Sequence, residues 1–187
     1  FSRPRPSGLI AINLKDGDNL IEASVTDGKK QIMLFSSAGK TIRFNESDVN
    51  CVGRSASGVK GITVAKDQLV ISMITSHEGD TDDILIATEN GYGKRTKIDE
   101  FSLQKRAGKG NIAVKTSDRN GNVIGALKVK ENDDLMLITD HGTLARTSIK
   151  DISQLGKNTQ GERKQKLGKD EKLSQIEKVE EEKVEEI

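Results

Sequence analysis

The chain has little of what usually builds a thick hydrophobic core. Among its 187 residues there is no tryptophan and one tyrosine, aromatic residues make up 3% and apolar residues only 33%. This composition excludes a thick core and predicts thin cores between small sheets. The single cysteine, Cys51, has no partner for an internal disulfide bond and fits a reducing compartment. No apolar run reaches the length of a transmembrane helix, and no signal peptide is recognisable.

What the sequence does have is a repeat of about fifty residues, a period typical of supersecondary units that stack or are arranged radially. Two glycines mark each period and are 19 residues apart: Gly39 and Gly58, Gly91 and Gly110, Gly142 and Gly161. An incomplete earlier copy opens the chain at Ser7-Gly8-Leu9. The repeat therefore predicts one small structural unit per period.

The content of each period predicts short strands. Apolar runs on either side of the first glycine predict hairpins, formed by residues 32–35 with 41–44, 84–87 with 94–96, and 135–138 with 144–146. After the second glycine we expect another hairpin, of residues 62–64 with 69–73 and of 112–114 with 123–127. Four short antiparallel strands per period, with no amphipathic helix inside any period, predict an all-β, propeller-like fold of about four blades. A stacked solenoid is the competing geometry.

The distribution of charge is more informative than the net charge of +1. From Lys94 to Lys109 there are six basic and two acidic residues, and equivalent positions in the other periods are also basic. In a radial fold, equivalent positions lie on one rim, and a basic rim can hold a phosphate backbone without reading the bases. The alternative is that these side chains only protect strand edges against aggregation.

No motif of the sequence brings a nucleophile and a base together, so we expect no enzymatic activity of its own. Tyr92 lies in a repeat turn where the other copies carry Lys40 and Thr143, and we expect it to be structural or on the surface. His77 and His141 are isolated, and no spacing fits a zinc or other metal site. For the acidic loop of residues 80–83, a solvated loop is expected rather than a weak cation site.

Several segments carry further motifs in register with the repeat. They are Phe1–Arg5 with Gly8–Ile12, Arg54–Gly61, Asn90–Thr96, Asn158–Gly161, and the segment Gln-Lys-Arg-Ala-Gly-Lys-Gly at 104–110. Over roughly residues 1–161 these motifs resemble the C-terminal domain of the DNA gyrase A protein, which has a glutamine–basic–Arg–Gly–Gly–basic–Gly box. Ala107 stands where that box has a glycine. The similar domain of the topoisomerase IV A protein, whose repeats are more degenerate, is the nearest alternative.

The resemblance implies a β-pinwheel, a propeller variant in which neighbouring blades exchange a strand. Such a domain binds duplex DNA around its basic perimeter and bends it, which supports ATP-dependent negative supercoiling by the whole type II topoisomerase. It also implies that ATP and Mg²⁺ act in other domains, that the partners are DNA, the gyrase B protein and a second gyrase A protein, and that the location is the bacterial cytoplasm, at the nucleoid. On its own, this segment is expected to be a monomer without cofactor, metal or membrane contact. A basic propeller used for protein interaction is the alternative from another functional class.

The resemblance implies a full domain of about six blades, so we expect this chain to be a piece that lacks the first of them. The segment 104–110 is then a later, degenerate copy of the box, expected to be an auxiliary DNA contact, or alternatively a loop whose glycines only shape a turn. The residues expected to contact DNA are Lys40, Arg43, Arg54, Lys60, Lys94, Arg95, Lys97, Gln104, Lys105, Arg106, Gly108, Lys109, Gly110, Arg146 and Lys157.

Residues 162–187 depart from the pattern and are expected to be a degenerate last half-blade and a charged, acidic tail. A strand at 162–166 would have polar residues on both faces, so we expect it to be weakly ordered or to pair only through its backbone at a sheet edge. Beyond it, the spacing of four apolar residues is typical of one helix face: Leu173, Ile176, Val179 and Val184. In the family, acidic tails compete for the basic surface, which the run Glu180–Glu182 fits; a solvated tail is the alternative.

Overall fold

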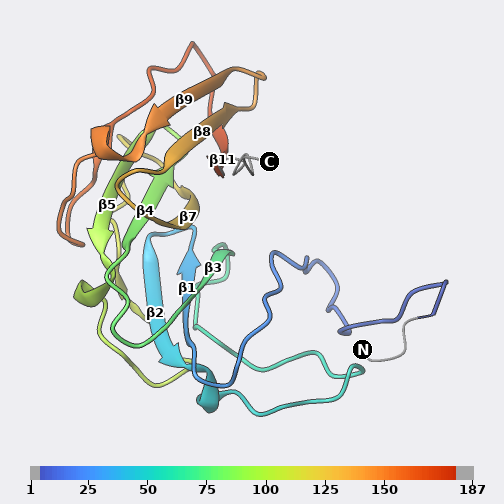
Figure 1. Cartoon of the computed structure of the whole chain (residues 1–187). Coiled ribbons are helices and arrows are strands. Elements are labelled where there is room, and N and C mark those ends of the chain that lie inside the picture. The colour runs from blue at the N-terminus through green and yellow to red at the C-terminus, as the bar shows by residue number, and fades with distance from the viewer. Residues whose placement is uncertain (1–4, 180–187) are drawn as a thin grey trace, which may run out of the picture.

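Three antiparallel sheets, one for each glycine-marked period, lie one beside the next in an arc in the computed structural model, which describes residues 5–179 (Figure 1). The first sheet has the order β3 (Val70–Ser76), β1 (Gln31–Ser36), β2 (Lys40–Asn45) and β6 (Asn111–Ile112). The second has the order β10 (Glu162–Arg163), β5 (Tyr92–Lys97), β4 (Asp83–Thr88) and β7 (Val123–Val129). The third has the order β11 (Leu173–Val179), β8 (Asp134–Thr139) and β9 (Leu144–Ser148).

The all-β, propeller-like fold class is confirmed, with three sheets formed rather than four. Residues 5–30, which cover the incomplete first copy, contain no strand. The only helices in the described part of the chain are three 3-10 turns, η1 (Glu46–Asp48), η2 (Ile98–Glu100) and η3 (Ile149–Asp151). None of the helices within residues 5–179 has the length and apolar character needed to cross a bilayer.

The hairpins around the first glycine of each period are confirmed as β1–β2, β4–β5 and β8–β9. The expected second hairpins are wrong. Residues 62–64 form no strand, and β6 does not pair with β7 of its own period but with β2 of the period before. In the same way β10 pairs with β5. Each of these strands therefore completes the sheet of the preceding repeat, which is the strand exchange that the resemblance implies.

Thin cores between the sheets hold the fold together, as the low aromatic content predicts. The middle strand β4 is buried along all six residues because both faces of its sheet are covered. Ile84 and Ile86 belong to the core shared with the first sheet, and Leu85 and Ala87 to the core shared with the third. Alternation along one strand thus fixes the order of the three sheets.

The helix expected from the spacing of Leu173 and Ile176 is wrong, because both residues lie in β11. Leu173 faces Thr139 of β8, but Gln175 faces the very next residue, Ile138, so Ser174 is an extra residue in the ladder. This β-bulge turns Leu173 and Ile176, three residues apart, toward the same core. A spacing of three, usually typical of a helix, here results from the bulge. Val184 and the run Glu180–Glu182 lie outside the described residues.

Polar residues 162–166 follow the expectation for an edge strand. Glu162 and Arg163 form β10, they are exposed, and they pair with Gly93 and Tyr92 at the edge of the second sheet. The pairing is not confined to the backbone, since the Arg163 guanidinium also lies over the ring of Tyr92.

Candidate nucleic-acid interface

The box-like segment 104–110 lies along the outer edge of the first sheet, beside β2 (Figure 1). Backbone hydrogen bonds hold it there: Gln104 N donates to Arg43 O at 2.7 Å, and Ala107 N donates to Gly61 O at 2.7 Å. At Gly110 (φ 66°), a Cβ atom would clash with the Thr41 carbonyl, so this glycine serves the close approach of two backbones. Gly108 is half-buried, and a Cβ atom added there would lie 3.5 Å from Ile42 Cδ1.

Arg106 and Ala107 shape this segment in different ways. The Arg106 guanidinium donates to the backbone oxygens of Asp48 (3.2 Å) and Lys60, so it holds the segment to the neighbouring loop. Ala107 has a left-handed backbone (φ 69°), a conformation that favours glycine, the residue that the resemblance leads us to expect at this position. Ala107 thus has a backbone conformation that a glycine would adopt more easily.

Lys94 links the second repeat to the third through hydrogen bonds. Its side chain is fully buried, and its Nζ donates to the carbonyls of Gly156 (2.7 Å) and Lys157 (2.9 Å) in the segment equivalent to the box. Burial lowers the pKa of this ammonium to about 8. Because the group has its partners inside the fold, we correct the expectation that Lys94 contacts DNA: its role is structural.

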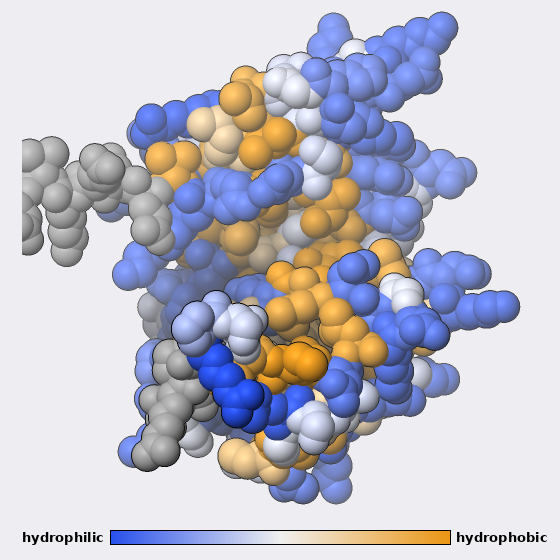
Figure 2. All heavy atoms as spheres, turned by 90° about the vertical axis from the view of Figure 1, so that its right-hand side faces the viewer, coloured by the Kyte–Doolittle hydropathy of each residue, from blue (hydrophilic) through white to orange (hydrophobic). Residues whose placement is uncertain are grey.

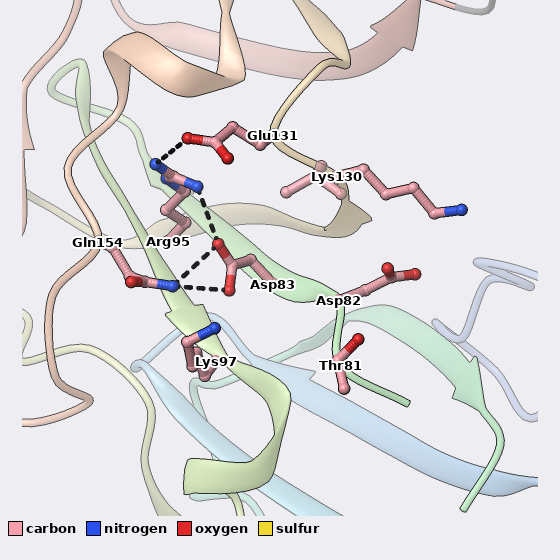
Figure 3. Close-up of a pocket in the computed structure, with 9 residues that line it drawn as sticks. Thr81, Asp82, Asp83, Arg95, Lys97, Lys130, Glu131 and Gln154 are labelled. Atoms are coloured by element: carbon pink, nitrogen blue, oxygen red, sulfur yellow. Dashed lines mark hydrogen bonds and ion pairs between the residues drawn. The ribbon is translucent and has the colours of Figure 1, made fainter. Parts of the chain in front are cut away.

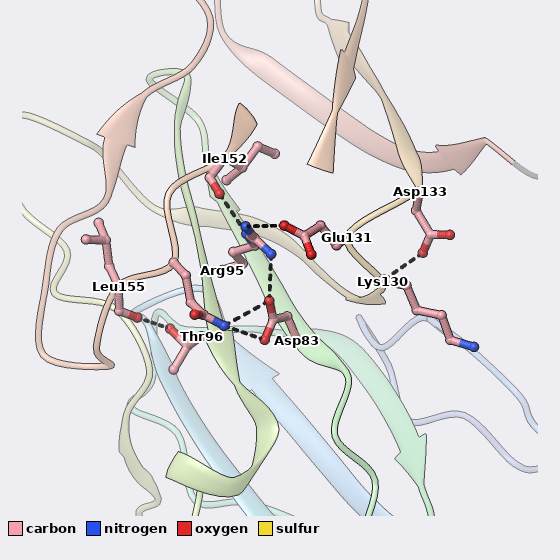
Figure 4. A network of polar contacts seen from close by, with 9 residues as sticks. Asp83, Arg95, Thr96, Lys130, Glu131, Asp133, Ile152 and Leu155 are labelled. Carbon is pink, nitrogen blue, oxygen red and sulfur yellow. Dashed lines mark hydrogen bonds and ion pairs between the residues drawn. The ribbon is translucent and has the colours of Figure 1, made fainter. Parts of the chain in front are cut away.

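Arg43 and Arg95 occupy equivalent positions in two repeats and fasten each repeat to the next. Arg43 is 8% exposed; its Nη1 donates to Ile98 O (2.8 Å) and Phe101 O (3.0 Å). Arg95 Nε donates to Ile152 O at 2.7 Å, and Figure 4 shows its guanidinium between that carbonyl and Asp83. Arg43 is buried and Arg95 is half-buried, and a guanidinium that is hydrogen-bonded on several sides within the fold is not free to bind phosphate. The expected DNA contact is therefore corrected for both arginines.

The acidic loop of residues 80–83 takes part in the same junction instead of being solvated. Asp83 accepts from Arg95 Nη1 at 3.0 Å and from Gln154 Nε2 at 3.0 Å, as Figure 3 shows. Asp80 accepts from Lys128 Nζ at 2.8 Å. The polar pocket in Figure 3 is lined by residues of both repeats, and its carboxylates are matched by arginine and lysine side chains. The pocket is thus best described as a contact between two repeats that is held by ion pairs.

The remaining basic residues of the expected set present their charges more freely. Within residues 5–179 most of them form no ion pair, although Arg54 donates to Ile10 O at 3.4 Å and Arg146 pairs with Asp134. Lys157 is half-buried and donates to Glu100 O at 2.8 Å. Exposed or half-buried lysines without an ion pair are Lys40, Lys60, Lys97, Lys105 and Lys109.

Two arginines outside the expected set meet at Tyr92. Arg119, from the turn before β7, and Arg163 of β10 both lie over the ring, at 5.1 and 5.3 Å from its centre. Tyr92 itself is 4% exposed, which confirms the expectation of a structural position. No signal in the sequence indicated this cluster, because its three members are far apart in the chain and their equivalents in other repeats differ.

One side of the molecule is more apolar than the sheet edges that carry the basic residues. Figure 2 views the side of Figure 1 on which β3, β7, β11 and the N-terminal loops lie, and it shows apolar side chains gathered in a band between hydrophilic margins. Exposed apolar residues of the N-terminal loops include Ile10, Leu14 and Leu20. Such a face is poorly suited to phosphates, whereas the opposite edges of the sheets carry the box-like segment and its lysines.

Comparison with known proteins gives a consistent result. The family model of the DNA gyrase C-terminal domain, a β-propeller, matches residues 2–27, 30–77, 82–130 and 133–180. The DNA gyrase A protein of Pseudomonas aeruginosa is 51% identical over 181 residues, 97% of this chain and 19% of that protein. The Escherichia coli protein is 48% identical over 161 residues, 86% of the chain and 18% of that protein. The chain thus spans about a fifth of the length of these relatives.

Solved structures agree with the fold. The structure of a DNA gyrase A C-terminal domain superposes with a TM-score of 0.83 at 28% identity, covering 92% of this chain and 58% of the other. A C-terminal domain of DNA topoisomerase IV gives 0.89 at 26% identity, covering 96% and 56%.

Proposed function

Because the chain belongs to the family of the DNA gyrase C-terminal domain, we propose that it binds duplex DNA without sequence preference along the outer edges of its sheets and bends it. The observation that carries this proposal is the box-like segment 104–110, which is hydrogen-bonded along the edge of β2 and leaves Lys105 and Lys109 exposed. Charges on a curved perimeter attract phosphates regardless of base sequence and favour a bent path.

The proposed contacts are a subset of the residues expected from the sequence. Lys105 and Lys109 are the principal phosphate contacts at the first sheet, supported by Lys40 and Lys60 nearby. Arg106 acts as a positioning residue, since its guanidinium holds the loop. Lys97, Lys157, Arg54 and Arg146 are peripheral contacts, and Gln104, Gly108 and Gly110 contribute through their backbones. Lys94, Arg43 and Arg95 are left out because their charged groups are used inside the fold.

The relatives support a place for this segment in a larger enzyme. In a whole gyrase A protein it would wrap DNA in support of ATP-dependent negative supercoiling, together with the gyrase B protein and a second gyrase A protein in the bacterial cytoplasm. ATP, Mg²⁺ and the cleavage chemistry would belong to other domains, so binding by this segment alone, as a monomer, should persist in EDTA. A role in topoisomerase IV is the alternative, but the identity of 51% with a gyrase A protein favours gyrase.

A protein-interaction role is the second candidate function, favoured by the apolar band of Figure 2. The dependence of DNA affinity on salt concentration distinguishes DNA binding from a protein-interaction role. If phosphates are bound, affinity for any duplex falls steeply with salt, and each lost contact lowers the slope of log K against log salt by about 1.

The matched variants are Lys105→Gln/Lys109→Gln and, as control, Lys15→Gln/Lys66→Gln, whose lysines are exposed in the loops on the β3 side. We expect the first pair to lower affinity for unrelated duplexes equally and the second to leave it unchanged. Equal effects of both pairs would overturn the assignment of the box lysines, and absence of duplex binding by the unmodified chain would favour the protein-interaction role.

A further inference from the structure

The cluster around Tyr92 joins two repeats at the outer edge of the second sheet. Arg119 Nε donates to the Tyr92 hydroxyl at 3.3 Å, and Arg163 Nη2 donates to the same oxygen at 3.1 Å. Each guanidinium also lies within 5.3 Å of the ring centre. The aromatic ring and the hydroxyl oxygen therefore bring two like charges to one point.

These two charges are not matched by an acid in the described part of the chain. Neither guanidinium is within ion-pair distance of a carboxylate of residues 5–179, and the other side-chain acceptor of Arg119 there is the amide oxygen of Gln160, at 3.4 Å. The carboxylate next to Arg163, that of Glu162, turns instead to Ser153 and Lys164. Two converging guanidinium groups without an acid form a site that attracts an anion.

The cluster occurs once among the repeats. Lys40 and Thr143 stand at the positions equivalent to Tyr92, and Ile112 stands where the next repeat has Arg163. The structure thus supplies a reason for one of the polar residues that interrupt the repeat after Gly161, Arg163. An apolar residue at 163, like Ile112, would leave Tyr92 without its second guanidinium.

The cluster also lies one repeat further along the same perimeter as the box. Ile112 follows Gly110 by two residues on β6 at the edge of β2, and Arg163 follows Gly161 by two residues on β10 at the edge of β5. Both arginines are exposed, and their guanidinium groups meet at the Tyr92 hydroxyl on β5. A duplex held at the box and following the arc of the sheets would meet the cluster next.

We propose that Arg119 and Arg163, oriented by Tyr92, form a phosphate-binding site that holds the DNA backbone at the second sheet. This inference rests on the proposed function. The two guanidinium groups supply the charge and the N–H donors, and the Tyr92 hydroxyl, which accepts from both, keeps its own proton for a phosphate oxygen. Contact with phosphate carries no base specificity.

The test uses Tyr92 as its own reporter, because the chain has one tyrosine and no tryptophan. The probes are a duplex of mixed sequence and inorganic phosphate, and the variants are Arg119→Gln/Arg163→Gln and Tyr92→Phe. We expect the duplex to change the tyrosine emission of the unmodified chain. In the arginine variant the salt slope should fall by about 2 and affinity at 0.1 M salt by roughly 10- to 60-fold for all sequences. Tyr92→Phe keeps the ring and should lose less.

A second readout follows the phenol directly. The hydrogen bond from Arg119, aided by that from Arg163, lowers the pKa of Tyr92. Bound phosphate neutralises the guanidinium groups, so it should raise that pKa toward its ordinary value, measured by absorbance near 295 nm. A response to inorganic phosphate with unchanged duplex affinity in the arginine variant would mean a site for free anions only, and would overturn the proposal.

The outcomes separate this inference from the proposed function. Suppose that the unmodified chain binds duplex DNA and that Lys105→Gln/Lys109→Gln lowers its affinity. If Arg119→Gln/Arg163→Gln then binds as tightly as the unmodified chain, the Tyr92 site is refuted and the proposed function stands. If the unmodified chain binds no duplex, both fail. Thermal unfolding of each variant guards against loss of fold, and a variant that has lost its fold is replaced by the single substitution Arg119→Gln, whose residue lies outside the strands.

Discussion

The exchange of strands between repeats can be tested at a single atom, the Cβ that alanine would add at Gly91. Gly91 and Gly142 occupy the same turn in successive repeats, with φ of 78° and 83°. At Gly91 the strand segment from the next repeat crosses the turn, and an added Cβ would clash with the carbonyl of Gln165. At Gly142 no atom of the described residues lies within 4 Å of that position. Gly142→Ala is therefore a matched control for Gly91→Ala.

The two substitutions share one cost and differ in another. Alanine in a left-handed conformation costs about 1–2 kcal/mol at either site, offset in part by the reduced entropy of the unfolded chain. Only at Gly91 must the crossing segment also move away. That segment donates two backbone hydrogen bonds to Gly91 O, from Lys164 at 2.8 Å and Gln165 at 3.1 Å. At about 1 kcal/mol each, their loss makes Gly91→Ala more destabilising than Gly142→Ala by about 2 kcal/mol.

Urea unfolding followed by far-UV circular dichroism measures both differences. We expect Gly91→Ala to lower the free energy of unfolding by about 3 kcal/mol and Gly142→Ala by about 1 kcal/mol. Equal losses would refute the reasoning, because they would mean that positive φ alone explains both glycines and that the crossing segment contributes nothing.

Three further predictions concern stability. Burial lowers the pKa of Lys94 to about 8, from 10.5 when exposed, so the unfolded chain binds more protons between these pH values. The free energy of unfolding should therefore rise by up to about 3 kcal/mol as the pH increases from 8 to 10.5. Lys94→Met should remove this rise, as measured by urea unfolding at several pH values. Hydrogen bonds from the Thr139 hydroxyl and the Gly168 amide lower the pKa of Glu171 to about 2, from 4.5, so the stability that this carboxylate contributes is complete above pH 4.5 and is lost as the pH falls toward 2. Glu171→Gln should flatten that part of the acid unfolding curve, and an unchanged curve would contradict the assignment. Ala107 has φ of 69°, so Ala107→Gly should raise the free energy of unfolding by about 0.5 kcal/mol. Ala107→Val, which introduces a β-branched side chain, should lower it by about 1 kcal/mol or more. If thermal unfolding showed the valine variant to be more stable than the glycine variant, strain at this residue would be excluded.

The repeat predicts the strands well and their partners poorly. Local apolar runs around Gly39, Gly91 and Gly142 contain enough information for the three hairpins, because a hairpin pairs neighbours in sequence. The strand after Gly110 looks like half of a second hairpin by the same signal. Its true partner, β2, is about 70 residues away in the chain, and no local pattern encodes that choice.

The site residues divide along the same line. Basic residues at equivalent positions correctly indicate a feature that repeats. They do not show whether it is a surface that binds DNA or a contact between neighbouring repeats. Arg43 and Arg95 repeat because each repeat needs a donor for the carbonyls at the next 3-10 turn, as their bonds to Ile98 and Ile152 show. Arg43 also bonds to Gln31 and Arg95 to Asp83 within the same repeat, but the carbonyls that both arginines reach belong to the next repeat, so sequence alone could not assign these arginines to the contact between repeats.

The measurement that tests the central proposal most directly is the ligation of a nicked circular plasmid in the presence of increasing amounts of the chain, followed by separation of the topoisomers. If the outer edges wrap DNA with a defined hand, the linking number shifts in one direction in proportion to bound chain, and Lys105→Gln/Lys109→Gln reduces the shift. A plasmid that is bound throughout, as gel retardation would show, but closes with an unchanged distribution of topoisomers would contradict the proposal that these blades bend and wrap DNA.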